Sequence, residues 1–193
     1  MKNKQYTLAL RLIHWLIAIS ILLLLITIFL RMTWLNKNHL ADIISGYLSV
    51  NNQSLSYDDI IILAKQIRKP MWIWHLYIGY FLIGLFITRI VLSFSGIAKI
   101  QNPTVKNLMI KERFQYWVYI AFYVFVFLSL VTGMLIVFGP DTLKKQVEFI
   151  HKLSIYYLIV YIVLHIGGIL IAEFTSQKGI ISWMVSGKSD NDS

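Results

Sequence analysis

Four histidines lie in the hydrophobic parts of this 193-residue chain, at a spacing that suits metal ligation. His151 and His165 are fourteen residues apart in the last hydrophobic segment. On a helix, that interval returns to within about 40° of the same face after a rise of about 21 Å. One helix is therefore expected to present two imidazoles in one direction, near opposite faces of a bilayer. His14 and His75 lie in the first and second hydrophobic segments, so two cross-helix pairs and two stacked haem sites are predicted.

The composition is that of a membrane protein. Hydrophobic residues make up 58% of the chain and charged residues 14%. Four apolar runs are long enough to cross a hydrocarbon core of about 30 Å, and they cover residues 8–30, 71–94, 114–138 and 149–172. We expect an all-α integral membrane protein in which residues 1–193 form one up-down-up-down four-helix bundle. The first run is too long for the apolar part of a signal peptide and lacks a small-residue cleavage site, so it is interpreted as a retained span.

The residue types exclude several kinds of cofactor and partner. The chain has no cysteine, which excludes disulfides, cysteine-ligated iron–sulfur clusters and the thioether attachment of c-type haem. The net charge of +9 comes from basic residues near the span ends. This placement favours lipid headgroups, carboxylate-bearing ligands or an acidic protein as partners, and not nucleic acid.

The orientation follows mainly from the first span. Four spans place both termini on one side of the membrane, and Lys2, Lys4 and Arg11 flank the first span on that side. Lysine and arginine counts on the two sides are nearly equal, but the first span usually has most influence on topology. We therefore predict that both termini are cytoplasmic, in the inner membrane of a bacterium.

The first loop, residues 31–70, is too long for a simple turn and is predicted to hold two short amphipathic helices on the periplasmic side. The first shows apolar residues at helical spacing, namely Leu40, Ile43, Ile44, Tyr47 and Leu48. The second is expected to begin at a capping box formed by Ser56 and Asp59 and to end at Pro70. Two interpretations remain open: a lid over the bundle, or a docking surface for a redox partner with Lys65, Arg68 and Lys69 as its charges.

Depth in the membrane predicts which histidines meet. His14 lies about six residues from the inner edge of its span, and His165 comes to a similar depth because its helix runs the opposite way. We call these two the inner pair. His75 and His151 both lie near the outer edge, and we call them the outer pair. The alternative for each histidine is an interhelical hydrogen bond without a metal.

Small and cationic residues near the histidines are suited to a haem. Gly79 follows His75 by one turn and would leave room for the macrocycle. Arg11 lies one turn from His14, and Arg89 follows His75 by fourteen residues, at the depth of the inner pair. A charged arginine within a span is costly without a partner, and a haem propionate would provide one. Alternatively, Arg89 extends to the inner interface.

At these residues the chain resembles the bacterial cytochrome b561 family, and within it the b-type cytochrome subunits of nickel–iron hydrogenases and related membrane electron carriers. The resembling segments are Arg11-Leu-Ile-His14-Trp15, Trp74-His75-Leu-Tyr-Ile-Gly79-Tyr80, His151 to His165, and the tail from Gly179 to Gly187. The resemblance covers nearly the whole chain. It implies a four-helix bundle with two b haems, one held by the inner pair and one by the outer pair.

The expected function is electron transfer between a periplasmic redox partner and the quinone pool. A hydrogenase, a dehydrogenase or a cytochrome would suit as that partner, and action alone as a superoxide–quinone oxidoreductase also fits. The chain is compatible with a homo-oligomer. A cation or proton transporter is a second class, but such sites usually include carboxylates. No aspartate or glutamate lies within a predicted span, and Glu173 lies only at the end of the fourth. A non-catalytic anchor subunit is a third class, and it would need no level histidine pairs.

Overall fold

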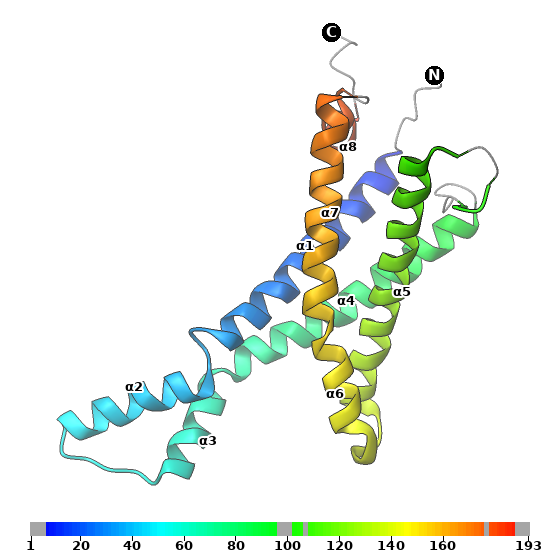
Figure 1. Ribbon diagram of the computed structural model, residues 1–193. Helices are drawn as coiled ribbons and strands as arrows, with labels where there is room; N and C mark the ends of the chain where they lie inside the picture. The colour runs from blue at the N-terminus through cyan, green and yellow to red at the C-terminus, as the bar shows by residue number, and fades with distance from the viewer. Residues whose placement is uncertain (1–6, 96–101, 106–107, 176–177, 188–193) are drawn as a thin grey trace. The chain divides into compact units, whose positions relative to one another are not determined.

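The computed structural model describes residues 7–95, 102–105, 108–175 and 178–187. Lys2 and Lys4, which carry part of the orientation prediction, lie outside the described residues. The elements in chain order are α1 (Leu8–Met32), α2 (Lys37–Val50), α3 (Tyr57–Ile67), α4 (Lys69–Phe94), α5 (Ile110–Phe138), η1 (Asp141–Leu143), α6 (Lys144–Lys152), α7 (Ser154–Phe174) and α8 (Ile180–Val185). Figure 1 shows these helices in order along the colour bar.

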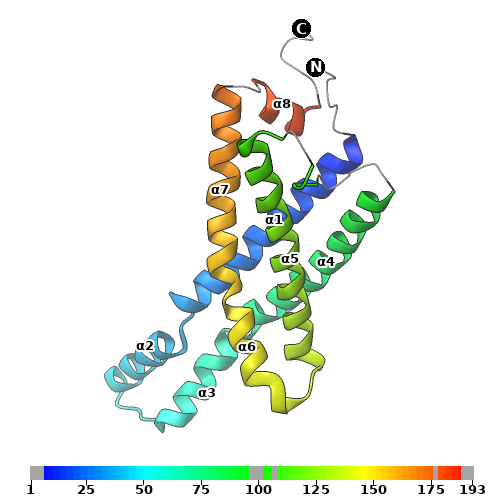
Figure 2. The same cartoon turned by 45° about the vertical axis from the view of Figure 1, so that its right-hand side comes forward.

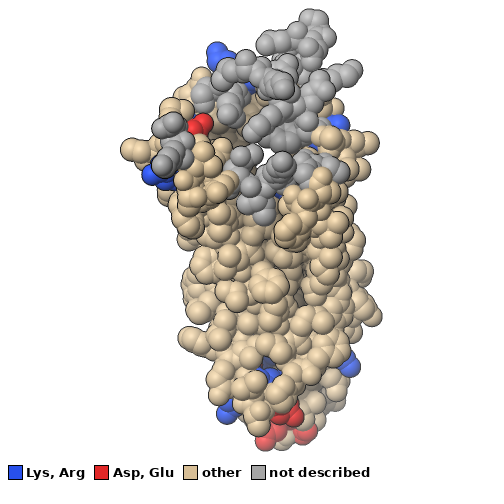
Figure 3. All heavy atoms as spheres, turned by 90° about the vertical axis from the view of Figure 1, so that its right-hand side faces the viewer, with Lys and Arg blue, Asp and Glu red and all other residues tan. Residues whose placement is uncertain are grey.

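Within the described residues, four stretches are long and apolar enough to cross a membrane, which confirms an all-α, multi-pass membrane helical bundle. They are α1, α4, α5 and the stretch Asp141–Phe174. Helices are the expected solution because a bilayer core offers no water to satisfy backbone N–H and C=O groups. Large side chains such as Phe94 and Phe174, 88% and 78% exposed, would face lipid. On the face shown in Figure 3, residues other than Lys, Arg, Asp and Glu (tan) cover the middle of the view, and the charged residues (blue and red) lie towards its top and bottom.

Two connections differ from the sequence prediction. Pro70 does not end α3, which stops at Ile67; it lies instead in the first turn of α4, where a missing N–H costs no hydrogen bond. The loop expected from Gly139 to Glu148 is shorter than predicted, because η1 and α6 already occupy most of it. The fourth span is therefore two helices, α6 and α7, which meet at Leu153.

The chain forms two compact units. The α5–α7 unit comprises residues 1–15 and 86–193, and the α2–α3 unit comprises residues 16–85. The boundaries therefore pass through α1 and α4, and the prediction of a single domain stays a prediction. In the α5–α7 unit, α5 packs against both α6 and α7. Figure 2 shows α8 turned back beside the end of α7.

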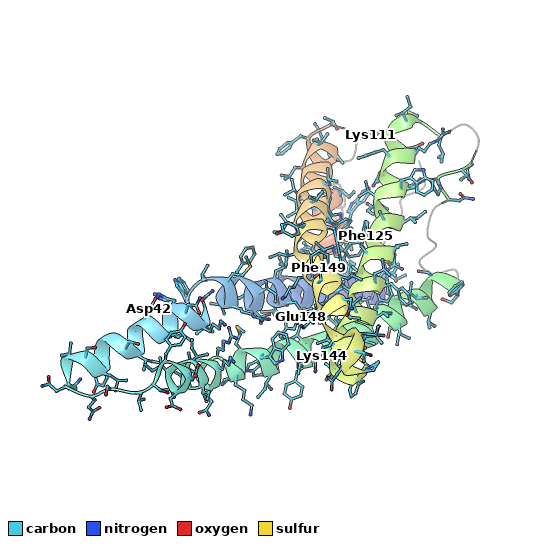
Figure 4. All side chains as sticks on the ribbon, turned by 60° about the horizontal axis from the view of Figure 1, so that its bottom comes forward. Asp42, Lys111, Phe125, Lys144, Glu148 and Phe149 are labelled. Atoms are coloured by element: carbon cyan, nitrogen blue, oxygen red, sulfur yellow. The ribbon has the colours of Figure 1, made fainter. Side chains whose placement is uncertain are left out.

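The α2–α3 unit confirms both predicted amphipathic helices. The two helices pack against each other, and each carries a buried alanine, Ala41 on α2 and Ala64 on α3, which are 2% and 0% exposed. Ser56 caps α3 as predicted: its hydroxyl accepts from the Asp59 N–H at 3.2 Å and donates to the Asp59 carboxylate at 2.6 Å. Figure 4 shows Asp42 on α2.

Candidate functional site

The inner pair of histidines is brought together inside the α5–α7 unit. His14 of α1 and His165 of α7 face each other with ring centroids 6.0 Å apart and ring planes tilted by 48°. The two residues are 151 positions apart in the sequence, and only matched depth in antiparallel helices brings them level. Among the residues that the structure describes, no hydrogen bond reaches the ring nitrogens of either histidine.

Aromatic side chains of α5 and α7 surround the ring of His165. Tyr161, one turn earlier on α7, stacks on it at 5.4 Å between centroids with planes 13° apart. Tyr119 of α5 contacts it edge-on at 6.5 Å. Tyr161 in turn stacks on Phe122 of α5 at 3.9 Å. These contacts hold the imidazole of His165 in one orientation before any ligand binds.

His75 is held within the α2–α3 unit by a hydroxyl and an aromatic ring. Its Nδ1 lies 2.7 Å from Oγ1 of Thr27 on α1. The indole of Trp72, three residues earlier on α4, stacks on the imidazole at 5.3 Å with planes 5° apart. The Arg31 guanidinium lies over the indole at 5.2 Å from its centroid, a cation–π contact. Thr27 and Arg31 of α1, one turn apart, thus hold Trp72 and His75 of α4.

Three residues of α5 contact His151 within the α5–α7 unit. Its Nδ1 lies 3.1 Å from the Ser129 carbonyl oxygen and 3.1 Å from Oγ1 of Thr132. Gly133 leaves room for the ring, because a Cβ at that position would lie 3.2 Å from Cε1 of His151. The Tyr157 hydroxyl of α7 donates to the Phe125 carbonyl at 2.7 Å and bonds the Ser129 hydroxyl. Figure 4 labels Phe125, whose ring stacks on Tyr157 at 4.8 Å.

The prediction that one helix carries both His151 and His165 is wrong in detail. His151 belongs to α6 and His165 to α7, and the chain tightens at the junction, where Leu153 N–H bonds Ile150 O and Tyr156 N–H bonds Leu153 O. Both imidazoles contact α5, His165 through Tyr119 and His151 through Thr132, and their common direction stays a prediction. His75 and His151 belong to different units, so the outer pairing stays a prediction.

The predicted cations lie in the α5–α7 unit. Arg89 of α4 donates to the Ser93 hydroxyl at 3.2 Å and lies 5.8 Å from the ring centroid of Tyr123. Arg11 donates through Nη1 to the Val185 carbonyl at 3.1 Å, and its Nε is buried without a hydrogen-bond partner in the structure.

Gly79 was predicted to leave room for a haem macrocycle beside His75. A Cβ placed on Gly79 would have no neighbour within 4 Å, and the same is true of Gly167 and Gly168, which follow His165. The Cβ of a residue substituted at any of these three positions would therefore contact no described protein atom. Gly133 is different, because the imidazole of His151 fills the space beside it.

The short helix α8 is tied at both ends. At its start, the Glu173 carboxylate of α7 accepts from the backbone N–H groups of Gly179 at 2.8 Å and Ile181 at 3.1 Å. At its end, the Trp15 indole donates to the Met184 carbonyl at 3.2 Å, next to the Arg11 contact described above. Glu173 is therefore engaged in a structural role, which weakens the case for it as a transport carboxylate.

Truncating Glu173 to alanine is expected to loosen α8. The change removes the acceptor for two N–H groups at the start of the helix, and these groups must then hydrogen-bond water instead. We expect trypsin to cleave the detergent-solubilised protein after Lys178 several-fold faster than in the wild type. Glu148→Ala is the control, since Glu148 pairs with Lys152 on α6 at 2.8 Å, and it should leave that cleavage rate unchanged. Equal rates in the wild type and the Glu173 variant would contradict this role.

The donor set fits a haem better than a bare metal ion. Among the described residues, no group of three or more histidine, cysteine, aspartate or glutamate side chains is placed to hold a metal ion. A haem supplies four ligands itself and needs only two axial ones. Two metal–nitrogen bonds of about 2 Å, together with the distance from each nitrogen to the centroid of its own ring, give about 6 Å between the imidazole centroids. The inner pair matches this separation at 6.0 Å.

Sequence reasoning missed the side chains that orient the histidines. These are Thr27 beside His75, and Ser129, Thr132 and Gly133 beside His151. A usable signal was present for the two threonines. Each is a hydroxyl within an apolar span at the depth of the histidine that it bonds, so the depth comparison used for the histidines would have found both.

Comparison with known proteins gives one match. A family model described as prokaryotic cytochrome b561 matches residues 5–187. No curated protein and no solved structure matches the chain.

Proposed function

Because the chain belongs to the prokaryotic cytochrome b561 family and has a b-type cytochrome role in membrane electron transfer, we propose that it carries two b haems. They would transfer electrons between a periplasmic redox partner and the quinone pool. The observation that carries this proposal is the inner pair: two imidazoles from different helices, 6.0 Å apart between centroids and with open space beside Gly167 and Gly168. His14 and His165 would be the axial ligands of the inner haem.

The second haem rests on His75 and His151. Each has its Nδ1 engaged by a hydroxyl or carbonyl of a neighbouring helix. Metal-ligating histidines usually use one ring nitrogen in this way and coordinate through the other. The similar depth that the sequence predicts for the two residues supports their pairing on one haem, with Gly79 leaving room for the macrocycle.

Two arginines are suited to the haem propionates. Arg89 is a cation within the membrane stretch of α4, in the same unit as His14, and a propionate carboxylate would complement its charge. Arg11 has a buried Nε that no described residue hydrogen-bonds, and its Nη1 is bonded to α8. We propose that Arg89 pairs directly with a propionate of the inner haem and that Arg11 offers its Nε to the same group.

A bound haem supplies a reversible one-electron couple. The residues of the chain hold the ligands at fixed orientation, exclude water with aromatic rings such as Tyr161 and Trp72, and provide a low dielectric around the site. In this proposal both termini are cytoplasmic in a bacterial inner membrane. The α2–α3 hairpin is then periplasmic and docks the redox partner, a hydrogenase, a dehydrogenase or a cytochrome.

The alternative of a cation or proton transporter has less support. Glu173 is the only carboxylate within the stretch Ser154–Phe174, and it accepts from two backbone N–H groups. A non-catalytic anchor would not require the close approach of His14 and His165.

Haem content tests the proposal directly. The protein purified from haem-replete bacterial membranes is expected to be red, and a pyridine haemochrome assay should give about two b haems per chain. One haem per chain would restrict the proposal to one of the pairs, and a colourless preparation would contradict it. Copurification of a redox partner, followed by quinone reduction with that partner as electron donor, then tests the two half-reactions.

A further inference from the structure

Two threonines make the same unusual contact with the two histidines of the outer pair. Thr27 of α1 bonds Nδ1 of His75 at 2.7 Å, and Thr132 of α5 bonds Nδ1 of His151 at 3.1 Å. The first contact lies within the α2–α3 unit and the second within the α5–α7 unit. Both threonine side chains are buried, at 7% and 8% exposure. The same contact, a threonine hydroxyl bonded to Nδ1, therefore forms separately at both histidines.

The proton of each threonine hydroxyl is already committed to its own helix. Thr27 Oγ1 lies 2.6 Å from the Leu24 carbonyl, and Thr132 Oγ1 lies 2.7 Å from the Leu128 carbonyl. A hydroxyl has one proton to donate, and a carbonyl oxygen only accepts. Each hydroxyl must therefore act as an acceptor towards the imidazole. The donor in both contacts is then the Nδ1–H group of the histidine.

At His151 a second acceptor leads to the same conclusion. The Ser129 carbonyl oxygen lies 3.1 Å from Nδ1, and this contact is a hydrogen bond only if Nδ1 carries the proton. A neutral imidazole carries one proton, so a proton on Nδ1 leaves the lone pair on Nε2. The inner pair differs, because within the described residues no hydrogen bond reaches the ring nitrogens of His14 or His165.

We propose that Thr27 and Thr132 are positioning residues that fix His75 and His151 in the Nδ1–H tautomer, so that Nε2 is the metal-facing nitrogen of both. This inference rests on the proposed haem function. A hydrogen bond from Nδ1–H raises the basicity of a ligating imidazole and favours the ferric state. The two threonines therefore lower the midpoint potential of the haem that His75 and His151 hold.

The test uses Thr27→Val and Thr132→Val, which keep the side-chain shape and remove the hydroxyl. Each variant is compared with the corresponding serine, which keeps the hydroxyl and removes the methyl group. Midpoint potentials are measured by optical redox titration of the purified protein, together with the ferric low-spin electron paramagnetic resonance spectrum. We expect each valine variant to shift one haem to a more positive potential, to change its ferric signal and to leave the other haem unchanged. Each serine variant should retain the wild-type values.

The outcomes separate the inference from the proposed function. Unchanged potentials in both valine variants, with two haems still bound, would overturn the inference alone. A shift in the serine variants and not in the valine variants would show a packing role and would also overturn it. A wild-type protein without haem would contradict the proposed function instead. If the two valine variants shift different haems, the tautomer assignment holds but the pairing of His75 with His151 is wrong.

Discussion

Replacing His165 by alanine is expected to remove the inner haem and leave the outer one, so the haem content falls from about two to about one per chain. The reason is that His165 and His14 face each other at 6.0 Å between centroids, and a haem with one remaining protein ligand there is held much more weakly. His14→Ala should remove the same haem. The two variants should therefore have identical reduced-minus-oxidised spectra, and the double variant should lose no more haem than either single variant.

His151→Ala provides the comparison for these variants. It should remove the other haem, and its residual spectrum should differ from that of His165→Ala. Because the alanine variants also lose packing, each is accompanied by a glutamine variant at the same position and by circular dichroism to show that the helices form. Full haem content in either His14→Ala or His165→Ala, with intact helices, would contradict the assignment of the inner pair.

Enlarging Gly133 is the second change with a large expected effect. A Cβ at this position would already lie 3.2 Å from Cε1 and 3.7 Å from Nδ1 of His151. Gly133→Ala should therefore displace the imidazole by a few tenths of an ångström. Gly133→Leu should push it away from Ser129 and Thr132, at an overpacking cost of about 1–3 kcal/mol. We expect the leucine variant to lose the outer haem and the alanine variant to bind it with an altered ferric spectrum.

Val131→Leu is the matched control, because Val131 lies on the same helix as Gly133 and its side chain is 37% exposed. It tests whether a larger side chain on α5 is itself harmful. The inner haem should remain in both Gly133 variants. Loss of the inner haem in Gly133→Leu, or an unchanged outer haem in that variant, would contradict the proposed role of Gly133.

Much of the architecture follows from the sequence alone. The four membrane stretches were predictable because apolar runs of that length have few alternatives in water or lipid. The α2–α3 hairpin was predictable from apolar periodicity and from the Ser56 cap. The approach of His14 to His165 followed from depth, since both helices rise at a known rate in opposite directions.

What sequence reasoning missed depends on local competition between conformations. The start of the fourth span was predicted too late, because residues 144–148 are polar except for Val147 and resemble a loop in composition although they are helical. Pro70 was assigned to the end of one helix and belongs to the first turn of the next, and a proline is compatible with both positions. The contacts of Thr132 and Gly133 with His151 depend on how α5 is rotated towards α6, which apolar periodicity does not specify in a helix that is apolar on every side.

The junction at Leu153 has an evolutionary consequence. On one continuous helix, the insertion or deletion of one residue between positions 151 and 165 would rotate one imidazole relative to the other by about 100° about the helix axis. Here α6 sets the direction of His151 through its packing on α5, and α7 sets the direction of His165 separately. We therefore expect α6 to tolerate sequence changes that alter the direction of His151 without a matching change around His165.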